Sequence, residues 1–304
     1  MDLSIIIINY NVRDFLLNSI QSIYDNVTGV KYEIIVVDNA SSDGSVESLK
    51  IKFPDVKVIA NSENVGFACA NNQGYAESSG AHLLLLNPDT LIKGDVIQSA
   101  LTFMEKTPDA GITGCRLLNP DGTLQRSIQR FPSVTNNLLK AFFLDGLFLA
   151  ENRKGTYYRP APLIIDYCSG AFMMVRREAL KGSELLNDAF FMYSEEKDLA
   201  LRLKKSGWKT YFIPFGEIIH FGGQSTGQMS EKIFLELQKS QATFYAAHYS
   251  KHKALALSFS WWLLLANTGM ASLPSAILGK DLCRARLFIM AARNWPKIAR
   301  EIVL

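Results

Sequence analysis

The sequence lacks any cysteine framework. Its four cysteines are scattered over 304 residues, with no CxxC pair and no tight spacing: Cys69, Cys115, Cys168 and Cys283. A zinc ribbon or a disulfide scaffold needs closely spaced cysteines, so both are excluded. We expect reduced structural thiols, as in a cytosolic protein. The first residues also lack a basic leader, so we expect no signal peptide and a cytoplasmic body.

Two common phosphate-binding loops are missing as well. No GxGxxG follows the first strand-like run, and no GxxxxGK[ST] occurs in the chain. These loops bring backbone amides close to a diphosphate, and their absence removes the main argument for a dinucleotide-binding or P-loop protein. The composition, 48% apolar and 20% charged, is that of a chain with a buried core.

The positive charge is small and unevenly placed. The net charge is +3, yet residues 251–304 contain eight Lys or Arg and two Asp or Glu. The first 250 residues are therefore mildly acidic, whereas a duplex DNA binder concentrates positive charge on its folded body. We expect no nucleic-acid partner.

The first third of the chain alternates between two periods. Strand-like apolar runs occupy Leu3–Ile8, Tyr32–Val37, Val56–Ile59, His82–Leu86 and Ala110–Cys115. Helical patterns separate them at Arg13–Tyr24, Val46–Phe53, Gly66–Ser78 and Asp95–Lys106. This alternation predicts an α/β fold with a doubly wound, mostly parallel sheet.

Residues 116–165 break this alternation with turn signals such as Asn-Pro-Asp-Gly at 119–122. We expect a long excursion with one helix near Asn136–Phe148, followed by a strand at Ala171–Arg176. A helix after Glu195 and a strand at Lys209–Ile213 should then lead into a loop that contains His220. We place a first domain at 1–226 and a helical, basic region at 227–304.

The basic region contains 26 consecutive uncharged residues, 254–279, flanked by Lys and Arg on both sides. Such a segment spans a membrane, re-enters it, lies in its interface or forms a buried helical hairpin. The adjacent basic excess favours membrane contact. A second helix should carry Arg286, Arg293, Lys297 and Arg300 on one face, with an interruption at Pro296.

Polar side chains follow each of the first four strand-like runs. They are Tyr10 and Asn11, then Asp38, then Asn64 with Gly66, then Asn87 with Asp89. Ligands of open α/β sheets bind beyond the carboxyl ends of the strands, although turns favour the same residue types. A carboxylate such as Asp38 can bind a base or a ribose. A second, Asp89, can hold Mg²⁺ or Mn²⁺ against a diphosphate.

A second group of candidates lies at the start of the later helix. Glu195, Glu196 and Asp198 crowd a helix N-terminus after an aromatic segment. Acidic residues there complement the helix dipole, but two adjacent Glu behind aromatic residues can also supply a base with a raised pKa. His220, before two glycines, is a candidate metal ligand or phosphate donor.

Together these segments resemble glycosyltransferase family 2, and within it the rhamnosyltransferase-like branch. The resemblance covers roughly residues 1–226. It rests on segments that include Val36–Gly44, Asn64–Ala68, Leu86–Thr90, Gly170–Met173, Glu195–Leu199 and His220. It implies a GT-A nucleotide-diphospho-sugar transferase fold with a helical C-terminal extension, and inverting chemistry.

The resemblance also implies roles for single residues. Asp38 would read a uracil or thymine base, and Tyr10, Asn11, Asn87 and the Asn64–Phe67 loop would line the nucleotide pocket. Asp89 would belong to a DxD-like motif and His220 would be a second ligand of Mg²⁺ or Mn²⁺. Glu196 would be the base, with Glu195 and Asp198 beside it.

Two departures from the family pattern bear on these roles. Asn87 stands where many relatives have a first Asp, which should weaken metal binding, and the acidic pair is Glu-Glu rather than Glu-Asp. We expect a dTDP- or UDP-sugar donor, a lipid-linked or oligosaccharide acceptor and association with the inner face of the cytoplasmic membrane. A UDP-hexose transferase, a nucleotidyltransferase and an inactive nucleotide-sugar binding protein are the alternatives.

Overall fold

A computed structural model describes residues 1–145, 154–181, 184–222, 231–277 and 282–303. The chain divides into two compact units. The first comprises Met1–Arg130, Tyr157–Phe191 and Glu195–Gly227, and the second Phe131–Thr156, Met192–Ser194 and Gln228–Leu304. Residues 131–156, inside the excursion, thus group with the C-terminal helices.

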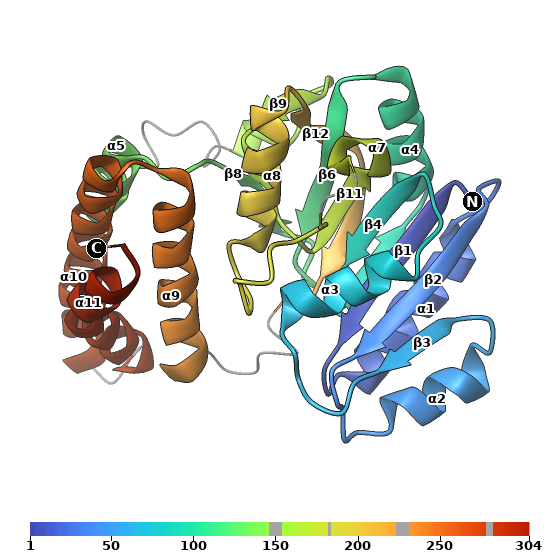
Figure 1. Cartoon of the computed structure of the whole chain (residues 1–304), viewed down its shortest axis with the longest axis horizontal. Coiled ribbons are helices and arrows are strands. Elements are labelled where there is room, and N and C mark those ends of the chain that lie inside the picture. Colours follow the sequence, from blue (N-terminus) through green and yellow to red (C-terminus); the bar gives the residue numbers. More distant parts are fainter. Residues whose placement is uncertain (146–153, 182–183, 223–230, 278–281, 304) are drawn as a thin grey trace. The chain divides into compact units, whose positions relative to one another are not determined.

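The first unit is built on one mixed sheet with the strand order β3-β2-β1-β4-β11-β6-β12-β5 (Figure 1). Its first half is parallel: β1 (Leu3–Asn9), β2 (Tyr32–Asp38), β3 (Lys57–Ala60) and β4 (His82–Leu86). Strand β11 (Phe172–Arg176) runs antiparallel between β4 and β6 (Ala110–Leu118). Strand β12 (Lys209–His220) then pairs parallel with β6 and antiparallel with β5 (Thr90–Lys93).

Alternate residues of β1 face opposite layers. Ile5 and Ile7 belong to the main core cluster with Leu16 and Ile20 of α1 (Arg13–Asn26). Ile6 faces the other side, because a Cβ added to Gly74 of α3 (Phe67–Ala76) would lie 2.6 Å from its Cγ2 atom. Helices therefore cover both faces, which explains why β1 is a continuous apolar run and confirms the predicted doubly wound sheet.

The remaining helices of this unit are α2 (Ser45–Lys52), α4 (Val96–Lys106), α7 (Arg177–Leu180) and α8 (Glu195–Lys205). Helix α4 packs on β6 and β12, and α8 packs on β12 and β10 (Tyr167–Cys168). Short strands β7 (Leu124–Gln125), β8 (Ile128–Gln129) and β9 (Leu163–Ile165) pair with β6, β10 and β12 respectively. A 3-10 turn at Lys154–Thr156 belongs to the second unit.

One strand differs from the prediction in a way that affects the site. We expected a strand to end at Ile213 and a loop to carry His220, but β12 continues to His220, which pairs with Thr90. The strand contains Pro214 and Gly216, residue types that weaken regular pairing. The pairing with β6 shifts its register between Phe212 and Glu217, and this irregularity accommodates both residues within the strand. Strand β5 was not predicted.

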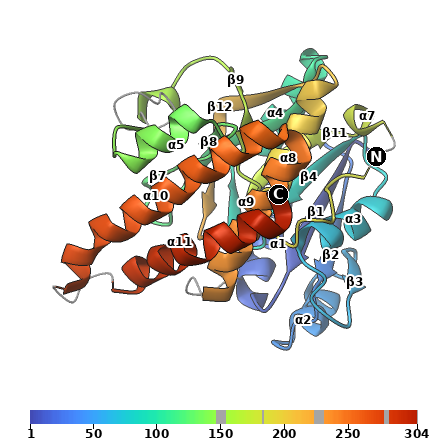
Figure 2. The same ribbon diagram turned by 60° about the vertical axis from the view of Figure 1, so that its left-hand side comes forward.

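The second unit contains helices α5 (Val134–Ala141), α9 (Glu231–His248), α10 (Lys251–Ile277) and α11 (Leu282–Val303). Helices α10 and α11 pack along each other, as Figure 2 shows, and α11 also packs on α9. Helix α5 is shorter than expected and ends at Ala141, and residues 146–148 of the expected helix lie outside the described residues.

The expected break at Pro296 is wrong, because α11 runs through this residue. The preceding residue, Trp295, is buried and its indole Nε1–H donates to the Ser258 carbonyl of α10 over 2.9 Å. Ring contacts with Tyr245 and Trp261 hold the same indole. This packing holds the segment around Pro296 against its neighbours, so the hydrogen bond that proline cannot make does not end the helix.

Candidate active site

The carboxyl ends of β1 and β2 meet in a buried polar cluster. Asn9 and Asp38 are register partners, and the Asn9 Nδ2–H donates to Asp38 Oδ2 over 2.7 Å. The other carboxylate oxygen, Oδ1, accepts from the Ser41 backbone N–H over 2.8 Å. Only 2% of Asp38 is exposed. Both carboxylate oxygens of Asp38 therefore hold the turn after β2. The predicted contact between Asp38 and a nucleotide base requires space for the base at this turn.

Tyr10 and Asn11 lie just beyond the end of β1. The Asn11 backbone adopts a left-handed φ of 55°, and its Oδ1 accepts from the Ser42 backbone N–H over 2.8 Å. Tyr10 is 37% exposed. The turns after β1 and β2 are thus tied together, and they present the Tyr10 ring on the surface at the sheet edge where ligands of this fold class bind.

The loop after β3 is fixed by Gly66. Asn64 Oδ1 accepts from the Gly66 backbone N–H over 3.0 Å, and Asn39 Nδ2–H donates to the Gly66 carbonyl over 3.2 Å. The next residue, Phe67, donates its backbone N–H to the Phe191 carbonyl over 2.7 Å. The loop at the end of β3 is therefore joined to the segment that precedes the acidic helix α8.

Asn87 and Asp89 follow β4 in a tight turn that leads into β5. The Asn87 carbonyl accepts from Thr90 Oγ1–H over 2.8 Å, and the Asn87 backbone N–H donates to the Ala171 carbonyl before β11. The Asp89 carbonyl accepts from the Phe221 backbone N–H over 2.9 Å. The turn after β4 is thereby fastened to the end of β12.

This fastening brings three predicted site residues together. Asp89 Oδ1 lies 3.3 Å from His220 Nε2, and Asn87 Nδ2 lies 3.2 Å from the same nitrogen. The Asp89 and His220 side chains are only 5% and 13% exposed. The sequence separation of about 130 residues is closed by the antiparallel pairing of β5 with β12.

The donor set fits a divalent cation that is shared with a substrate. Two cis ligands of an octahedral ion, each about 2.1 Å from it, lie roughly 3 Å apart, close to the observed spacing of Asp89 Oδ1 and His220 Nε2. Within the described part of the chain, no group of three or more His, Cys, Asp or Glu side chains is arranged to hold a metal ion. Two protein ligands leave most positions to water and diphosphate oxygens, as is usual for Mg²⁺ in phosphate-transfer sites.

The acidic helix α8 begins directly after two left-handed residues, Tyr193 and Ser194, with φ values of 68° and 70°. Glu195 is buried, Glu196 is partly exposed, and one oxygen of each carboxyl group is buried without a hydrogen-bond partner. Burial raises the pKa of both groups, and the Glu196 charge raises the pKa of Glu195 further. A carboxylate with a raised pKa is a stronger base than an ordinary one, which is the property that a general base needs.

Asp198 plays a different part in the same helix. Its side chain is 1% exposed, and Asp198 Oδ2 accepts from Arg202 Nε over 2.7 Å. Arg202 also donates to the Leu185 carbonyl over 2.8 Å. Asp198 therefore holds the start of α8 against the preceding segment, which leaves Glu195 and Glu196 as candidates for the base.

Several residues of this site were not among the predicted ones. Asn9 and Ser41 fix Asp38, the Phe191 carbonyl fixes Phe67, and Gln125 Oε1 lies 2.6 Å from His220 Nδ1. The first two lie beside predicted residues and were visible as polar strand-end positions. Phe191 and Gln125 act through tertiary contacts that no sequence spacing indicates.

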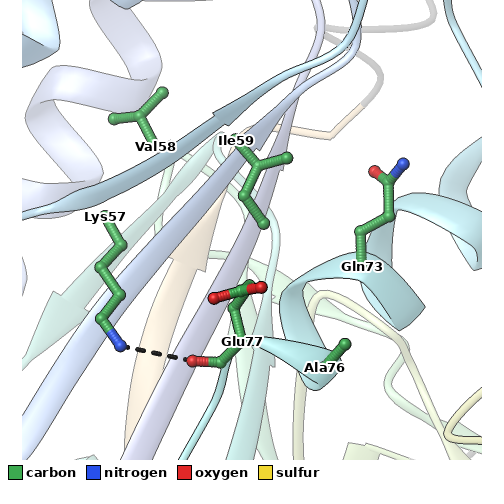
Figure 3. A pocket seen from close by; sticks show the side chains of 6 residues that line it. All are labelled: Lys57, Val58, Ile59, Gln73, Ala76 and Glu77. Carbon is green, nitrogen blue, oxygen red and sulfur yellow. Dashed lines mark hydrogen bonds between the residues drawn. The ribbon is translucent and has the colours of Figure 1, made fainter.

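A pocket of 550 Å³ lies elsewhere in the first unit, at the edge strand β3 (Figure 3). It is lined by Lys57, Val58, Ile59, Gln73, Ala76 and Glu77. Lys57 Nζ donates to the Glu77 carbonyl across it over 3.3 Å. It contains none of the predicted site residues, so we do not assign the chemistry to it.

Comparison with known families settles the class of the protein. Residues 4–183 match the sequence model of glycosyl transferase family 2. The chain belongs to this family. It is therefore a glycosyltransferase, and the resemblance seen in the sequence is confirmed.

The chain is also similar to two named rhamnosyltransferases over most of its length. The chain is 27% identical over 245 residues to the N-acetylglucosaminyl-diphospho-decaprenol L-rhamnosyltransferase of Mycobacterium tuberculosis, covering 75% of this chain and 76% of the relative. It is 26% identical over 250 residues to rhamnosyltransferase WbbL of Escherichia coli, covering 80% of this chain and 92% of that one.

A solved structure confirms the GT-A fold. The mannosyltransferase PcManGT from Pyrobaculum calidifontis, in complex with GDP-Man and Mn²⁺, superposes with a TM-score of 0.57 at 14% identity. The match covers 99% of this chain and 84% of that one.

Proposed function

We propose that this family 2 glycosyltransferase moves rhamnose or another deoxyhexose from a dTDP- or UDP-linked donor to a lipid-linked or oligosaccharide acceptor in cell-surface polysaccharide synthesis. The sugar is suggested by two relatives named as rhamnosyltransferases, one of which acts on a diphospho-decaprenol substrate. The observation that carries the proposal is the 3.3 Å approach of Asp89 to His220.

The nucleotide would bind at the ends of β1, β2 and β3. Tyr10 offers an exposed ring for stacking on a base, and Asn11 and the Asn64–Phe67 loop border the same sheet edge. Asp38 would contact the base only if the turn at Ser41 admits it, and otherwise it serves to hold that turn. A rigid turn favours binding because little conformational entropy is lost when the donor arrives.

Asp89 and His220 would hold Mg²⁺ or Mn²⁺ against the donor diphosphate, and Asn87 would lie beside them. The cation, when bound, neutralises negative charge that develops on the leaving nucleoside diphosphate. Because Asn87 has no charge, the protein contributes a single carboxylate here. We therefore expect tight cation binding only together with the nucleotide.

Glu196 is the proposed base. It is partly exposed, whereas Glu195 is buried and Asp198 is engaged by Arg202. The acceptor oxygen would attack the anomeric carbon as its proton passes to the Glu196 carboxylate, and the bond from that carbon to the diphosphate oxygen would break. One such displacement inverts the anomeric configuration.

The second unit is proposed to hold the enzyme at the inner face of the cytoplasmic membrane. Among the described residues, one helix, Lys251–Leu273 within α10, is long and apolar enough to cross a membrane, and only 33% of its apolar window is buried. Four large apolar residues of this helix are exposed and follow helical spacing: Leu255, Phe259, Met270 and Leu273. We call these four residues the apolar stripe.

Charge supports the same interpretation. Arg286, Arg293, Lys297 and Arg300 of α11 are all exposed. Basic side chains close to an apolar surface favour anionic lipid headgroups, each contributing roughly 1 kcal/mol near the membrane. A bound membrane would bring a lipid-linked acceptor to the enzyme without requiring a high-affinity acceptor site.

The test is a thermal-shift panel of dTDP-rhamnose, other dTDP-sugars, UDP-sugars and GDP-mannose, each with and without Mn²⁺. Selective binding to the folded state should stabilise the protein by about 2.7 kcal/mol at a hundredfold excess over Kd. Asp89→Asn should abolish the Mn²⁺-dependent part of the shift. Asp55→Asn, a change of an exposed carboxylate before the start of β3 and so away from the carboxyl ends of the strands, should leave it intact.

The nucleotide sugars that stabilise the protein are then assayed for transfer of their sugar to a polyprenyl-diphospho-sugar acceptor. Transfer from dTDP-rhamnose with inversion would support the full proposal. A thermal shift with a UDP-hexose alone would replace rhamnose with that hexose in the proposed function. Binding without turnover would indicate an inactive nucleotide-sugar binding protein. No shift with any nucleotide sugar would overturn the proposed donor site.

A further inference from the structure

A chain of four side chains leads from the surface to the Nδ1 side of His220. Thr123 Oγ1–H donates to Asp121 Oδ1 over 2.6 Å, and Asn119 Nδ2–H donates to Thr123 Oγ1 over 2.9 Å. Gln125 Nε2–H donates to Asn119 Oδ1 over 3.0 Å, and His220 Nδ1 lies 2.6 Å from Gln125 Oε1. All five residues belong to the first unit.

The direction of every hydrogen bond in this chain follows from its outer end. The hydrogen bond from Thr123 lowers the pKa of Asp121, so this carboxylate is ionised and can only accept. Thr123 must then donate outward and accept from an amide N–H. Because the amides of Asn119 and Gln125 donate toward Asp121, their oxygen atoms point toward His220. Gln125 therefore presents an acceptor oxygen to His220.

A second contact fixes the Gln125 amide in the same orientation. Its Nε2–H group also donates to the His220 carbonyl over 3.3 Å. Both donors of this amide therefore face acceptors, one on Asn119 and one on the strand β12 itself. An inverted amide would place an oxygen against two acceptors, and it would leave His220 Nδ1 facing an N–H group.

We propose that the chain Asp121–Thr123–Asn119–Gln125 fixes His220 as the tautomer that carries its proton on Nδ1, so that Nε2 presents a lone pair toward Asp89. Asn87 Nδ2–H already faces this nitrogen at 3.2 Å, as a lone pair requires. Gln125 is then a positioning residue. It acts through His220 and need not touch the substrate.

The consequence lies on the Nε2 side of the ring. A lone pair and a carboxylate oxygen 3.3 Å apart repel each other unless a cation lies against both. Fixing the proton on Nδ1 would therefore make the pair a ligand set rather than an internal hydrogen bond. This step rests on the proposed function, because it takes Asp89 and His220 as ligands of a divalent cation.

The experiment reads the tautomer directly in metal-free protein. The chain contains four histidines, so labelling them with ¹⁵N gives a simple long-range ¹H–¹⁵N spectrum, and His220→Gln identifies the signals of interest. At pH 8 the wild type should carry its proton on Nδ1. Gln125→Met, which removes the acceptor, should move a large share of the population to the Nε2 form.

Two further variants make the result specific. The hydrogen bonds from Asp121 through Thr123 and Asn119 to Gln125 are called the relay below. Thr123→Val interrupts the relay at an exposed turn, so it tests the relay even if Gln125→Met does not fold. It should shift the tautomer in the same direction. Gln98→Met makes the same substitution on α4 and should change nothing. Mn²⁺ binding in the presence of UDP, followed by electron paramagnetic resonance, should weaken about tenfold or more in Gln125→Met.

The outcomes separate the relay from the proposed function. A wild-type proton on Nε2, a doubly protonated ring, or an unchanged tautomer in Gln125→Met and Thr123→Val would overturn the relay. A shifted tautomer with unchanged Mn²⁺ affinity would overturn its role in metal binding. If the wild type shows the Nδ1 form but binds no Mn²⁺, the proposed metal site fails and the relay stands.

Discussion

A Cβ atom placed on Gly66 would lie 2.6 Å from the carbonyl oxygen of Phe191 and 2.7 Å from its ring. The two residues are 125 positions apart in the sequence. One lies beside the predicted nucleotide-binding residues, and the other precedes the acidic residues of α8. Gly66 belongs to the loop after β3, and Phe191 precedes the segment that leads to Glu195. Their contact, together with the Phe67 N–H bond to Phe191, sets the spacing between these two loops.

Gly66→Ala should therefore lower both stability and donor binding. The residue has a φ of +88°, which costs an L-residue on the order of 1 kcal/mol, and the new methyl group also meets Phe191. Gly29→Ala is the matched control, because Gly29 has a φ of +72° with nothing within 4 Å of the added Cβ. Thermal shifts with the preferred donor should fall in Gly66→Ala only. Equal effects in both variants would contradict the role of the contact.

Glu196→Gln should remove transfer and leave donor binding intact, because the amide cannot accept the acceptor proton. The loss of kcat should be about 10²-fold or more. In the wild type, burial raises the pKa of Glu196, so the rate should fall on acidification at a higher pH than an ordinary carboxylate would give. A pH–rate profile and a donor-binding isotherm check both points. Unchanged turnover in Glu196→Gln would reject it as the base.

Glu195→Gln should stabilise the folded protein at neutral pH. The pKa of Glu195 is raised in the folded state, so the native protein binds this proton more tightly than the unfolded chain. The favourable contribution is present below the ordinary pKa and is lost as pH rises through the folded value. The gain from Glu195→Gln should therefore be larger at pH 8 than at pH 5, measured by urea unfolding. Glu184→Gln, an exposed carboxyl group, should show no such difference.

Glu33→Gln should have the opposite pH dependence. Burial tends to raise the pKa of Glu33, but hydrogen bonds from Lys57, Ser79 and Ser4 outweigh it and lower the value to about 2. The resulting stabilisation is present above the unfolded pKa and disappears as pH falls toward about 2. Glu33→Gln should lose on the order of 2 kcal/mol at neutral pH, and this difference should shrink in acid.

The control for Glu33→Gln is Glu47→Gln, which changes an exposed carboxyl group on α2. In urea unfolding at several pH values, Glu33→Gln should have a lower free energy of unfolding than the wild type, and Glu47→Gln should not. A difference that grows toward low pH would contradict the assigned direction of the pKa shift.

Phe259→Ser should weaken binding to anionic vesicles. Phe259 is 64% exposed at the middle of the apolar stripe. Removing its ring reduces the apolar area that would be buried when the stripe binds a membrane. Ile51→Ser is the control, because Ile51 is 84% exposed on α2 of the first unit. Co-sedimentation with vesicles of phosphatidylglycerol should fall in Phe259→Ser and not in Ile51→Ser. Equal binding of both variants would exclude the stripe as the docking face.

Local patterns predicted much of the parallel half-sheet and its helices. The strand β4 was predicted at His82–Leu86, where it lies. The continuous apolar runs of β1 and β2 are visible in the local sequence, and they are typical of strands that are buried on both faces. The last strand was predicted too short, and only its pairing with β6 and β5 shows that it continues through Pro214 and Gly216 to His220.

The sequence by itself determined the family, the α/β alternation and the residue types at the strand ends, because these depend on local spacing. Tertiary structure alone decided which of these residues meet. The pairing of β5 with β12 places His220 beside Asp89, and the pairing of β7 with β6 sets Gln125 in β7 next to β6. The β5–β12 pairing joins residues about 130 positions apart, and its energy comes from backbone pairing and burial that no local pattern encodes.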